Sequence, residues 1–112
     1  MVKQETRLVI RQFDVVHNTD VSTRHRIPYL IILQVDVLGR LPSVVVAPLY
    51  RAASAEALTR ITFPLRINDE EVHCLVHELA AVQPGELGAL VDNFSQCRDE
   101  VIRAIDLIFS GI

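Results

Sequence analysis

The sequence predicts a mostly β domain of the α+β class, a small curled antiparallel sheet or open barrel with one C-terminal α-helix. Two observations support this prediction. Short segments rich in β-branched and large apolar residues alternate with turn residues, and about five of them have the length of a strand. The last segment instead repeats its apolar residues at every third or fourth position, which is the spacing of one helix face.

The first half of the chain is expected to hold three strands. Arg11 to Val16 alternates apolar with polar residues, as a half-buried strand does, and His17 to Asp20 supplies turn residues. Tyr29 to Val37 is apolar on both faces and is expected to be the central strand. Val44 to Ala47 forms the next strand, which Pro48 is expected to end or to place at an edge.

The middle of the chain is expected to hold a short helix and a hairpin. Arg51 to Arg60 is rich in alanine, which favours one or two helical turns. Ile61 to Ile67 and Glu71 to Ala80 are expected to pair as antiparallel strands around the polar turn Asn68-Asp69-Glu70. Pro64 then belongs near an edge of the sheet, since proline cannot donate a ladder hydrogen bond.

The end of the chain is expected to be helical. Leu87, Leu90 and Val91 favour a short helical turn, and the main helix is expected over residues 93–110, capped by Asn93 or Ser95. Its core-facing residues are expected to be Phe94, Cys97, Val101, Ala104, Ile105, Ile108 and Ile112. The large apolar residues of the final positions Phe109 to Ile112 are either docked or form a binding surface.

Length and composition limit the class of protein. A chain of 112 residues is expected to be one domain, and no apolar run approaches the about 20 residues of a membrane-spanning helix. Half of the residues are hydrophobic, an excess that favours association into a homodimer. Residues 1–10 carry charges and lack the apolar core of a signal peptide, which predicts a cytoplasmic protein.

Candidate chemistry is sparse. The net charge of −3 argues against broad attachment to nucleic acid. Arg24, His25 and Arg26 form a small basic cluster that either meets an acidic segment of a partner or is a solvated loop. The sequence has no Gly-rich phosphate loop, no Gly-x-Ser-x-Gly motif and no informative carboxylate pair, so no catalytic residue and no cofactor are predicted.

The two cysteines and their neighbouring histidines are interpreted as structural. Cys74 and Cys97 are expected to be buried, unpaired thiols in a reducing compartment. His73 and His77 are four residues apart, which on a strand separates the imidazoles by roughly 13 Å, too far to share a zinc ion. Satisfied surface or half-buried histidines are therefore expected, with no metal site.

Several stretches in order carry a resemblance to one family. They are AIDLIFSGI (Ala104 to Ile112), RQFDV (Arg11 to Val15), RIPYLIILQVDVL (Arg26 to Leu38), RLPSVVVAPL (Arg40 to Leu49) and the segment that starts ITFPLRINDEEVHCLV. Together they resemble the CcdB-type toxins of bacterial type II toxin–antitoxin modules. Because the likeness begins near Arg11, residues 1–10 are expected to be an N-terminal extension of a single domain.

The resemblance implies an SH3-like barrel and a non-enzymatic toxin. Members of the family bind the A subunit of DNA gyrase as symmetric dimers, and a flexible C-terminal segment of a cognate antitoxin neutralises them. The residues that correspond to the family's gyrase-binding tip are Phe109, Ser110, Gly111 and Ile112, with Asp106 one turn earlier and Val37 and Leu38 as an apolar loop pair. Arg24 and Arg26 are possible antitoxin contacts.

One departure from the family stands in the tip. The family signature ends in Phe-Trp-Gly-Ile, whereas this chain has Ser110 at the tryptophan position and no tryptophan at all. Serine cannot stack on a partner, so gyrase poisoning is expected to be weaker. Two alternatives remain: a non-toxic homologue or a toxin for another target, which keeps only antitoxin binding, and a ribonuclease of the related MazF and Kid group that uses the cluster Arg24, His25 and Arg26.

Overall fold

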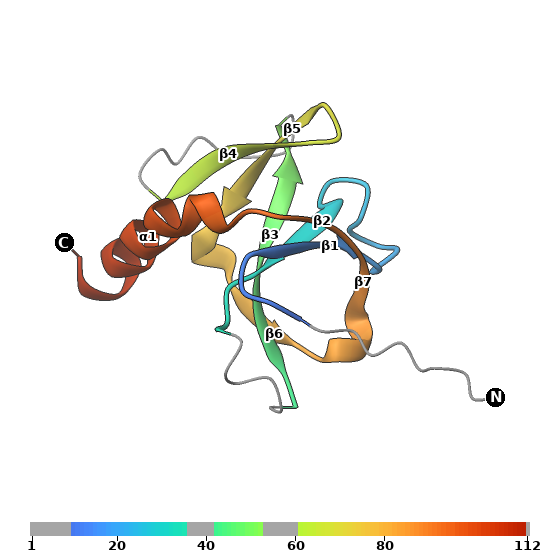
Figure 1. Cartoon of the computed structure of the whole chain (residues 1–112), viewed down its shortest axis with the longest axis horizontal. Coiled ribbons are helices and arrows are strands. Elements are labelled where there is room, and N and C mark those ends of the chain that lie inside the picture. Colours follow the sequence, from blue (N-terminus) through green and yellow to red (C-terminus); the bar gives the residue numbers. More distant parts are fainter. Residues whose placement is uncertain (1–9, 36–41, 53–60, 112) are drawn as a thin grey trace.

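A curled antiparallel sheet with one helix along its side makes up the described part of the chain (Figure 1). The computed structural model describes residues 10–35, 42–52 and 61–111. Its elements in order are β1 (Asp14–Asn18), β2 (Tyr29–Ile32), β3 (Val44–Arg51), β4 (Thr62–Ile67), β5 (Glu70–Leu75), η3 (Val76–Glu78), β6 (Ala80–Val82), η4 (Pro84–Glu86), β7 (Leu87–Asn93), η5 (Ser95–Cys97) and α1 (Arg98–Ser110). The η elements are single turns of 3-10 helix.

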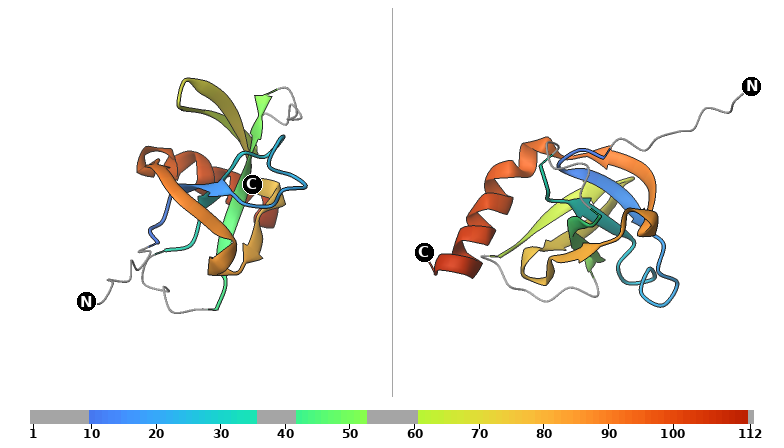
Figure 2. Two further views of the ribbon diagram at one scale, coloured as in Figure 1. Left: turned by 90° about the vertical axis from the view of Figure 1, so that its right-hand side faces the viewer. Right: turned by 90° about the horizontal axis from the view of Figure 1, so that it is seen from below.

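The sheet has the strand order β4-β5-β3-β2-β1-β7, with β6 as a third partner of β3, and every pairing is antiparallel. Figure 2 shows the sheet curled into a half-open barrel with α1 lying along one side. The predicted mostly β class with one C-terminal helix is confirmed. The expectation of about five strands was too low, since the described residues form seven.

Two hydrophobic clusters explain why the middle strands are apolar on both faces. The main core lies between one face of the sheet and α1, and includes Val15, Ile31, Leu49 and Val101. A second core on the other face contains Val16, Ile32, Val44, Val46 and Leu87. Strand β2 contributes to both clusters and lies between two neighbours, as the sequence predicted for a buried strand. It ends at Ile32, earlier than expected.

Pro48 lies inside β3, which contradicts the prediction that it ends the strand or lies at an edge. The amide of Leu33 donates to the carbonyl oxygen of Val45, so Val45 turns its backbone groups toward β2. Because these groups alternate along an antiparallel strand, Pro48 turns its nitrogen the other way. On that side the β6 pairing stops at Val46 and the β5 pairing starts at Leu49, so the missing N–H falls in a break between two partners.

The first strand begins later than predicted, because Phe13 adopts a positive φ of 69° in the turn that precedes β1. His17 and Asn18, which were expected in a turn, belong to the strand and pair with β2 or β7. Asp14, a polar residue of the alternating segment Arg11 to Val16, is buried, with 6% of its surface exposed. Its carboxylate accepts hydrogen bonds from the backbone of Arg11 and the side chain of Asn93, both at 2.9 Å.

The hairpin of β4 and β5 confirms the predicted pairing. Asn68 and Asp69 form a two-residue turn, both with positive φ, and Pro64 lies on the edge strand β4. The expected strand over Glu71 to Ala80 is interrupted, because the chain turns through η3 before β6 pairs with a different part of β3. The expected helical turn over Leu87 to Val91 is wrong as well, since this segment is the strand β7.

Helix α1 begins at Arg98, later than predicted, because residues 95–97 form a 3-10 turn. Neither predicted cap lies at its first turn: the N-cap residue is Cys97, and the side chain of Asn93 instead accepts from the amide of Ser95. Val101 and Ala104 are buried in the main core, and Ile105 and Ile108 pack against it. No helix in the described ranges is long and apolar enough to cross a membrane. Of the segment predicted to be helical, Arg51 to Arg60, Arg51 instead ends β3, and residues 53–60 lie outside those ranges.

Candidate functional site

The C-terminal end of α1 is the candidate protein-binding tip. Phe109 is 71% exposed on the last turn of the helix. Gly111 follows in the left-handed region with a φ of 72°, and its amide donates to the carbonyl oxygen of Leu107 at 3.1 Å. A left-handed glycine at this position is a common helix end, because glycine adopts that conformation without steric cost. The aromatic side chain is therefore presented at the point where the chain leaves the helix.

Ser110 is exposed, and its hydroxyl is bonded within the helix. Its hydroxyl donates to the carbonyl oxygen of Asp106 at 2.7 Å, one turn back. Beneath it lies a shallow groove of about 540 Å³, lined by Asp99, Ile102, Arg103, Asp106 and Ser110. The groove combines two carboxylates, one guanidinium and the partly exposed Ile102. It has room beside Ser110 for a large side chain.

The structure brings together four of the predicted tip residues. Asp106, Phe109, Ser110 and Gly111 occupy the last turn and a half of α1 and its end. Ile112, Val37 and Leu38 lie outside the described residues, so their part in the tip stays a prediction. Figure 1 shows this end of α1 on the opposite side of the molecule from the loop between β1 and β2, which contains the basic cluster.

A second groove, which we call the basic groove, lies at that opposite side. It has a volume of about 580 Å³ and is lined by His17, Asn18, Thr19, Arg24, His25, Pro28, Tyr29, Arg51, Gly88 and Ala89. Two members of the predicted cluster, Arg24 and His25, line it. Arg26 is not among the lining residues. The pKa of Asp20 is lowered chiefly by hydrogen bonds from the hydroxyl and amide of Ser22, with a smaller contribution from the charge of Arg26.

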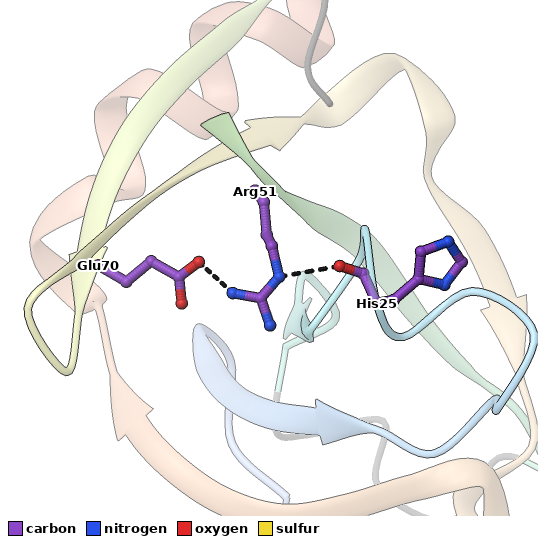
Figure 3. Close-up of polar contacts among 3 residues, drawn as sticks. All are labelled: His25, Arg51 and Glu70. Carbon is purple, nitrogen blue, oxygen red and sulfur yellow. Dashed lines mark hydrogen bonds and ion pairs between the residues drawn. The ribbon is translucent and has the colours of Figure 1, made fainter. Parts of the chain in front are cut away.

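Arg51 fixes one wall of the basic groove. Its Nε donates to the carbonyl oxygen of His25 at 2.8 Å, and its terminal nitrogen forms an ion pair with Glu70 (Figure 3). Its backbone amide also donates to the carbonyl oxygen of Arg26. The ring of His17 packs against Tyr29, with 5.5 Å between the ring centroids. Arg51 therefore ties the loop of the basic cluster to strands β3 and β5.

Sequence reasoning did not find His17 or Arg51 as groove residues. Both stand at the polar end of an apolar row, two positions beyond Val15 and Leu49 of the main core. Alternate residues of a strand share a face, so a switch from apolar to basic residues at the strand ends was the available signal.

His73 and His77 contact different carboxylates, and Cys74 and Cys97 are buried in the core. His73 contacts the carboxylate of Glu71 at 2.8 Å, whereas His77 lies beyond β5 in η3, near Glu78. Cys74 and Cys97 are free and buried, as predicted. Burial raises the pKa of the Cys74 thiol well above its ordinary value, and burial, assisted by the charge of Glu100, raises the pKa of Cys97 to about 11. Within the described ranges no three His, Cys, Asp or Glu side chains form a metal-ligand group.

The family model for CcdB protein matches residues 12–111 of the chain. The chain belongs to the CcdB family. The resemblance seen in the sequence is thereby confirmed, and the matched residues include the lining of the basic groove and the described tip residues Asp106 and Phe109 to Gly111. No curated protein sequence matches the chain.

One solved structure with the same fold as this CcdB family member is described as an endoribonuclease in complex with its cognate antitoxin, from a mycobacterial species. The TM-score is 0.67 and the sequence identity is 11%, over 88% of this chain and 93% of that chain. A likeness at this level of identity concerns the fold and leaves the chemistry open.

Proposed function

We propose that the protein is the toxin of a bacterial type II toxin–antitoxin module and acts by binding a target protein, without chemistry of its own. The observation that supports this most directly is the exposed ring of Phe109 on the last turn of α1. Interface hot spots are commonly aromatic residues that become fully buried on binding. A ring held at a glycine-terminated helix end suits insertion into a partner's pocket.

The proposed target is the A subunit of DNA gyrase, which the family membership favours. The proposed contact residues are Phe109, Ser110, Gly111 and Ile112, together with Asp106, Val37 and Leu38. The shallow groove below Ser110 adds an amphipathic surface, in which Ile102 lies between charged side chains. A partner can therefore bury the ring and meet the charges of the helix in one contact.

We further propose that Ser110 weakens gyrase poisoning. An aromatic hot-spot residue supplies about 2 kcal/mol or more of binding free energy, and a symmetric dimer loses this contribution twice. The Ser110 hydroxyl already donates to the carbonyl oxygen of Asp106, so it has no second proton to offer a partner. The alternatives are a toxin with another target and a non-toxic homologue that keeps only antitoxin binding.

The proposed assembly is a cytoplasmic homodimer that a cognate antitoxin neutralises through a flexible C-terminal segment. Light scattering of the purified chain is expected to give twice the mass of 12.6 kDa. A mass that stays at the monomer value over a broad concentration range would remove the dimer from the proposal.

The test of the proposed function is Ser110→Trp, with growth arrest on expression and binding to the gyrase A subunit as the two readouts. The variant is expected to bind and arrest growth more strongly than the wild type, because it restores an aromatic side chain that a partner can bury. Ser110→Ala, which removes only the hydroxyl, and Gln96→Trp, on the exposed surface before α1, are the controls. If Ser110→Trp neither binds nor arrests growth while the dimer stays intact, gyrase is not the target.

A second candidate function is RNA cleavage, which the gathering of two histidines and two arginines in the basic groove favours. We expect no cleavage, because the chain carries a net charge of −3 and RNA affinity depends largely on cationic side chains. Incubation with a mixed RNA pool tests this. Specific cuts that disappear in His25→Ala or Arg24→Ala would make the protein a ribonuclease.

A further inference from the structure

The basic groove lies where the main-core face of the sheet turns polar. Val15, Ile31, Leu49 and Val72 are apolar members of that face on four successive strands of the fold. Two residues further toward one end of each strand, the same face carries His17, Tyr29, Arg51 and Glu70. Register places His17 opposite Tyr29, whereas Tyr29 lies opposite Leu49 and Arg51 opposite Val72, so the row of end residues is staggered from strand to strand. The ends of these strands and the loop that carries Arg24 and His25 therefore form the groove together.

The positive charge of this groove is only partly compensated. Glu70 pairs with Arg51, while the described residues offer no hydrogen bond or ion pair to the side chains of Arg24 and His25. Arg51 uses one N–H for the carbonyl of His25 and one for Glu70. A guanidinium has about five N–H donors, so roughly three remain for a ligand. Such a fork matches a carboxylate with two parallel hydrogen bonds.

We propose that the basic groove binds the carboxylates of an extended acidic peptide segment, the segment by which the antitoxin holds this toxin. The choice of the antitoxin as the source of this segment rests on the proposed function. The recognition of carboxylates depends only on the side chains of the groove, Arg24, His25, His17 and Arg51. A carboxylate of the peptide pairs with Arg51 or Arg24, and an apolar side chain next to it packs on Tyr29 and Pro28.

The surroundings favour a peptide over a nucleic acid strand. Glu70 is paired with the lining residue Arg51, and Asp20 belongs to the same loop as the lining residues Arg24 and His25, so two carboxylates lie next to groove residues. A phosphodiester strand carries a charge at every nucleotide and would meet these carboxylates, whereas a peptide places its charges only where its sequence has them. In addition, β7 pairs with β1 alone in the described part of the chain, and Gly88 and Ala89 of β7 line the groove. An extended peptide can use the backbone of such an edge.

The test measures binding to the purified full chain by fluorescence anisotropy. The probe is a labelled peptide of alternating Glu and Leu, compared with the matching peptide of Gln and Leu and with a short single-stranded RNA. The Glu-Leu peptide is expected to bind most tightly. Arg24→Glu and the double variant His17→Ala with Arg24→Ala are expected to weaken its binding by about tenfold or more. Arg98→Glu makes the same charge change at the start of α1 and is expected to leave binding unchanged.

Three results would overturn the proposal. Tighter binding of the RNA, lost in Arg24→Glu, would make the groove a nucleic acid site. Equal binding of the Glu-Leu and Gln-Leu peptides, or of neither, would show that carboxylates are not recognised there. If Arg98→Glu loses as much peptide binding as Arg24→Glu, the binding depends on the net charge of the chain and not on the groove. Melting curves identify variants that fail to fold. Because the assay contains neither gyrase nor antitoxin, a failure of the proposed gyrase target leaves its outcome unchanged.

Discussion

The carbonyl oxygen of His17 lies only 2.7 Å from the place that a Cβ atom on Gly88 would occupy. The Cβ of His17 is equally close, at 2.8 Å. This contact occurs where the pairing of β1 with β7 shifts register between Val16 and Asn18. An irregularity of this kind bends the strands and brings their backbones together. Gly88 is therefore needed for space, and it holds β7 against the strand that supplies His17 to the basic groove.

Gly88→Ala is expected to destabilise the fold by about 1–3 kcal/mol, since backbone atoms must move to admit the methyl group. The melting temperature should fall by about 4 °C or more. Gly85→Ala is the matched control, because a Cβ there meets nothing within 4 Å and the backbone has no positive φ. Calorimetry of both variants measures the difference. Equal melting temperatures for the two would show that β7 can shift away from His17 at no cost.

Asn93→Ala is expected to cost about 1–3 kcal/mol, because it leaves the buried carboxylate of Asp14 with one fewer donor. The same substitution removes the bond from Asn93 to the carbonyl oxygen of Gln12 and the acceptor for the amide of Ser95. Urea unfolding measures the loss, with the exposed neighbour Gln96→Ala as the control. Adding Asp14→Asn tests the coupling: additive losses in the double variant would mean that the Asp14 to Asn93 bond contributes nothing.

Stability is expected to fall at alkaline pH because of the buried thiols. The pKa of Cys97 is raised by burial from 9.0 to about 11 in the folded chain. Above pH 9.0 the thiols of the unfolded chain lose protons first, so the contribution of Cys97 is complete below that pH and is lost as the pH rises through about 11. Urea midpoints measured between about pH 8 and about pH 10 should therefore decline. Cys97→Ala should show a shallower decline, whatever its stability at neutral pH.

Gly111→Ala is expected to weaken target binding while leaving the stability of the fold nearly unchanged. A left-handed conformation costs a residue with a Cβ about 1–2 kcal/mol, yet no atom lies within 4 Å of the place where the Cβ would be. The strain can relax by turning the end of the chain, so the melting temperature should change little while target binding weakens. Gly111→Asn should retain binding, because asparagine tolerates this conformation best after glycine. Equal binding by all three proteins would show that the direction of the last residue does not matter.

Local sequence patterns were sufficient for the parts of this fold that short-range physics controls. The period of three and four residues identified the side of α1 that carries Val101 and Ala104, because a helix puts these positions on one face. Asn68 and Asp69 predicted the hairpin of β4 and β5, because both tolerate the positive φ that a two-residue turn requires. Gly111 at the helix end could also be anticipated from the order of residues there, whereas the sequence left open whether Phe109 is docked or exposed.

Long-range pairing decided the rest. Asp14 is buried because Asn93, distant in the chain, arrives beside it, and no local pattern predicts that meeting. Pro48 is accommodated inside β3 only because two partner strands leave a break opposite its nitrogen. The segment from Leu87 has a weak helical preference that pairing with β1 overrides. The basic groove combines His17, Arg24, Arg51 and Gly88 from separate segments, since a curled sheet brings the ends of several strands to one place.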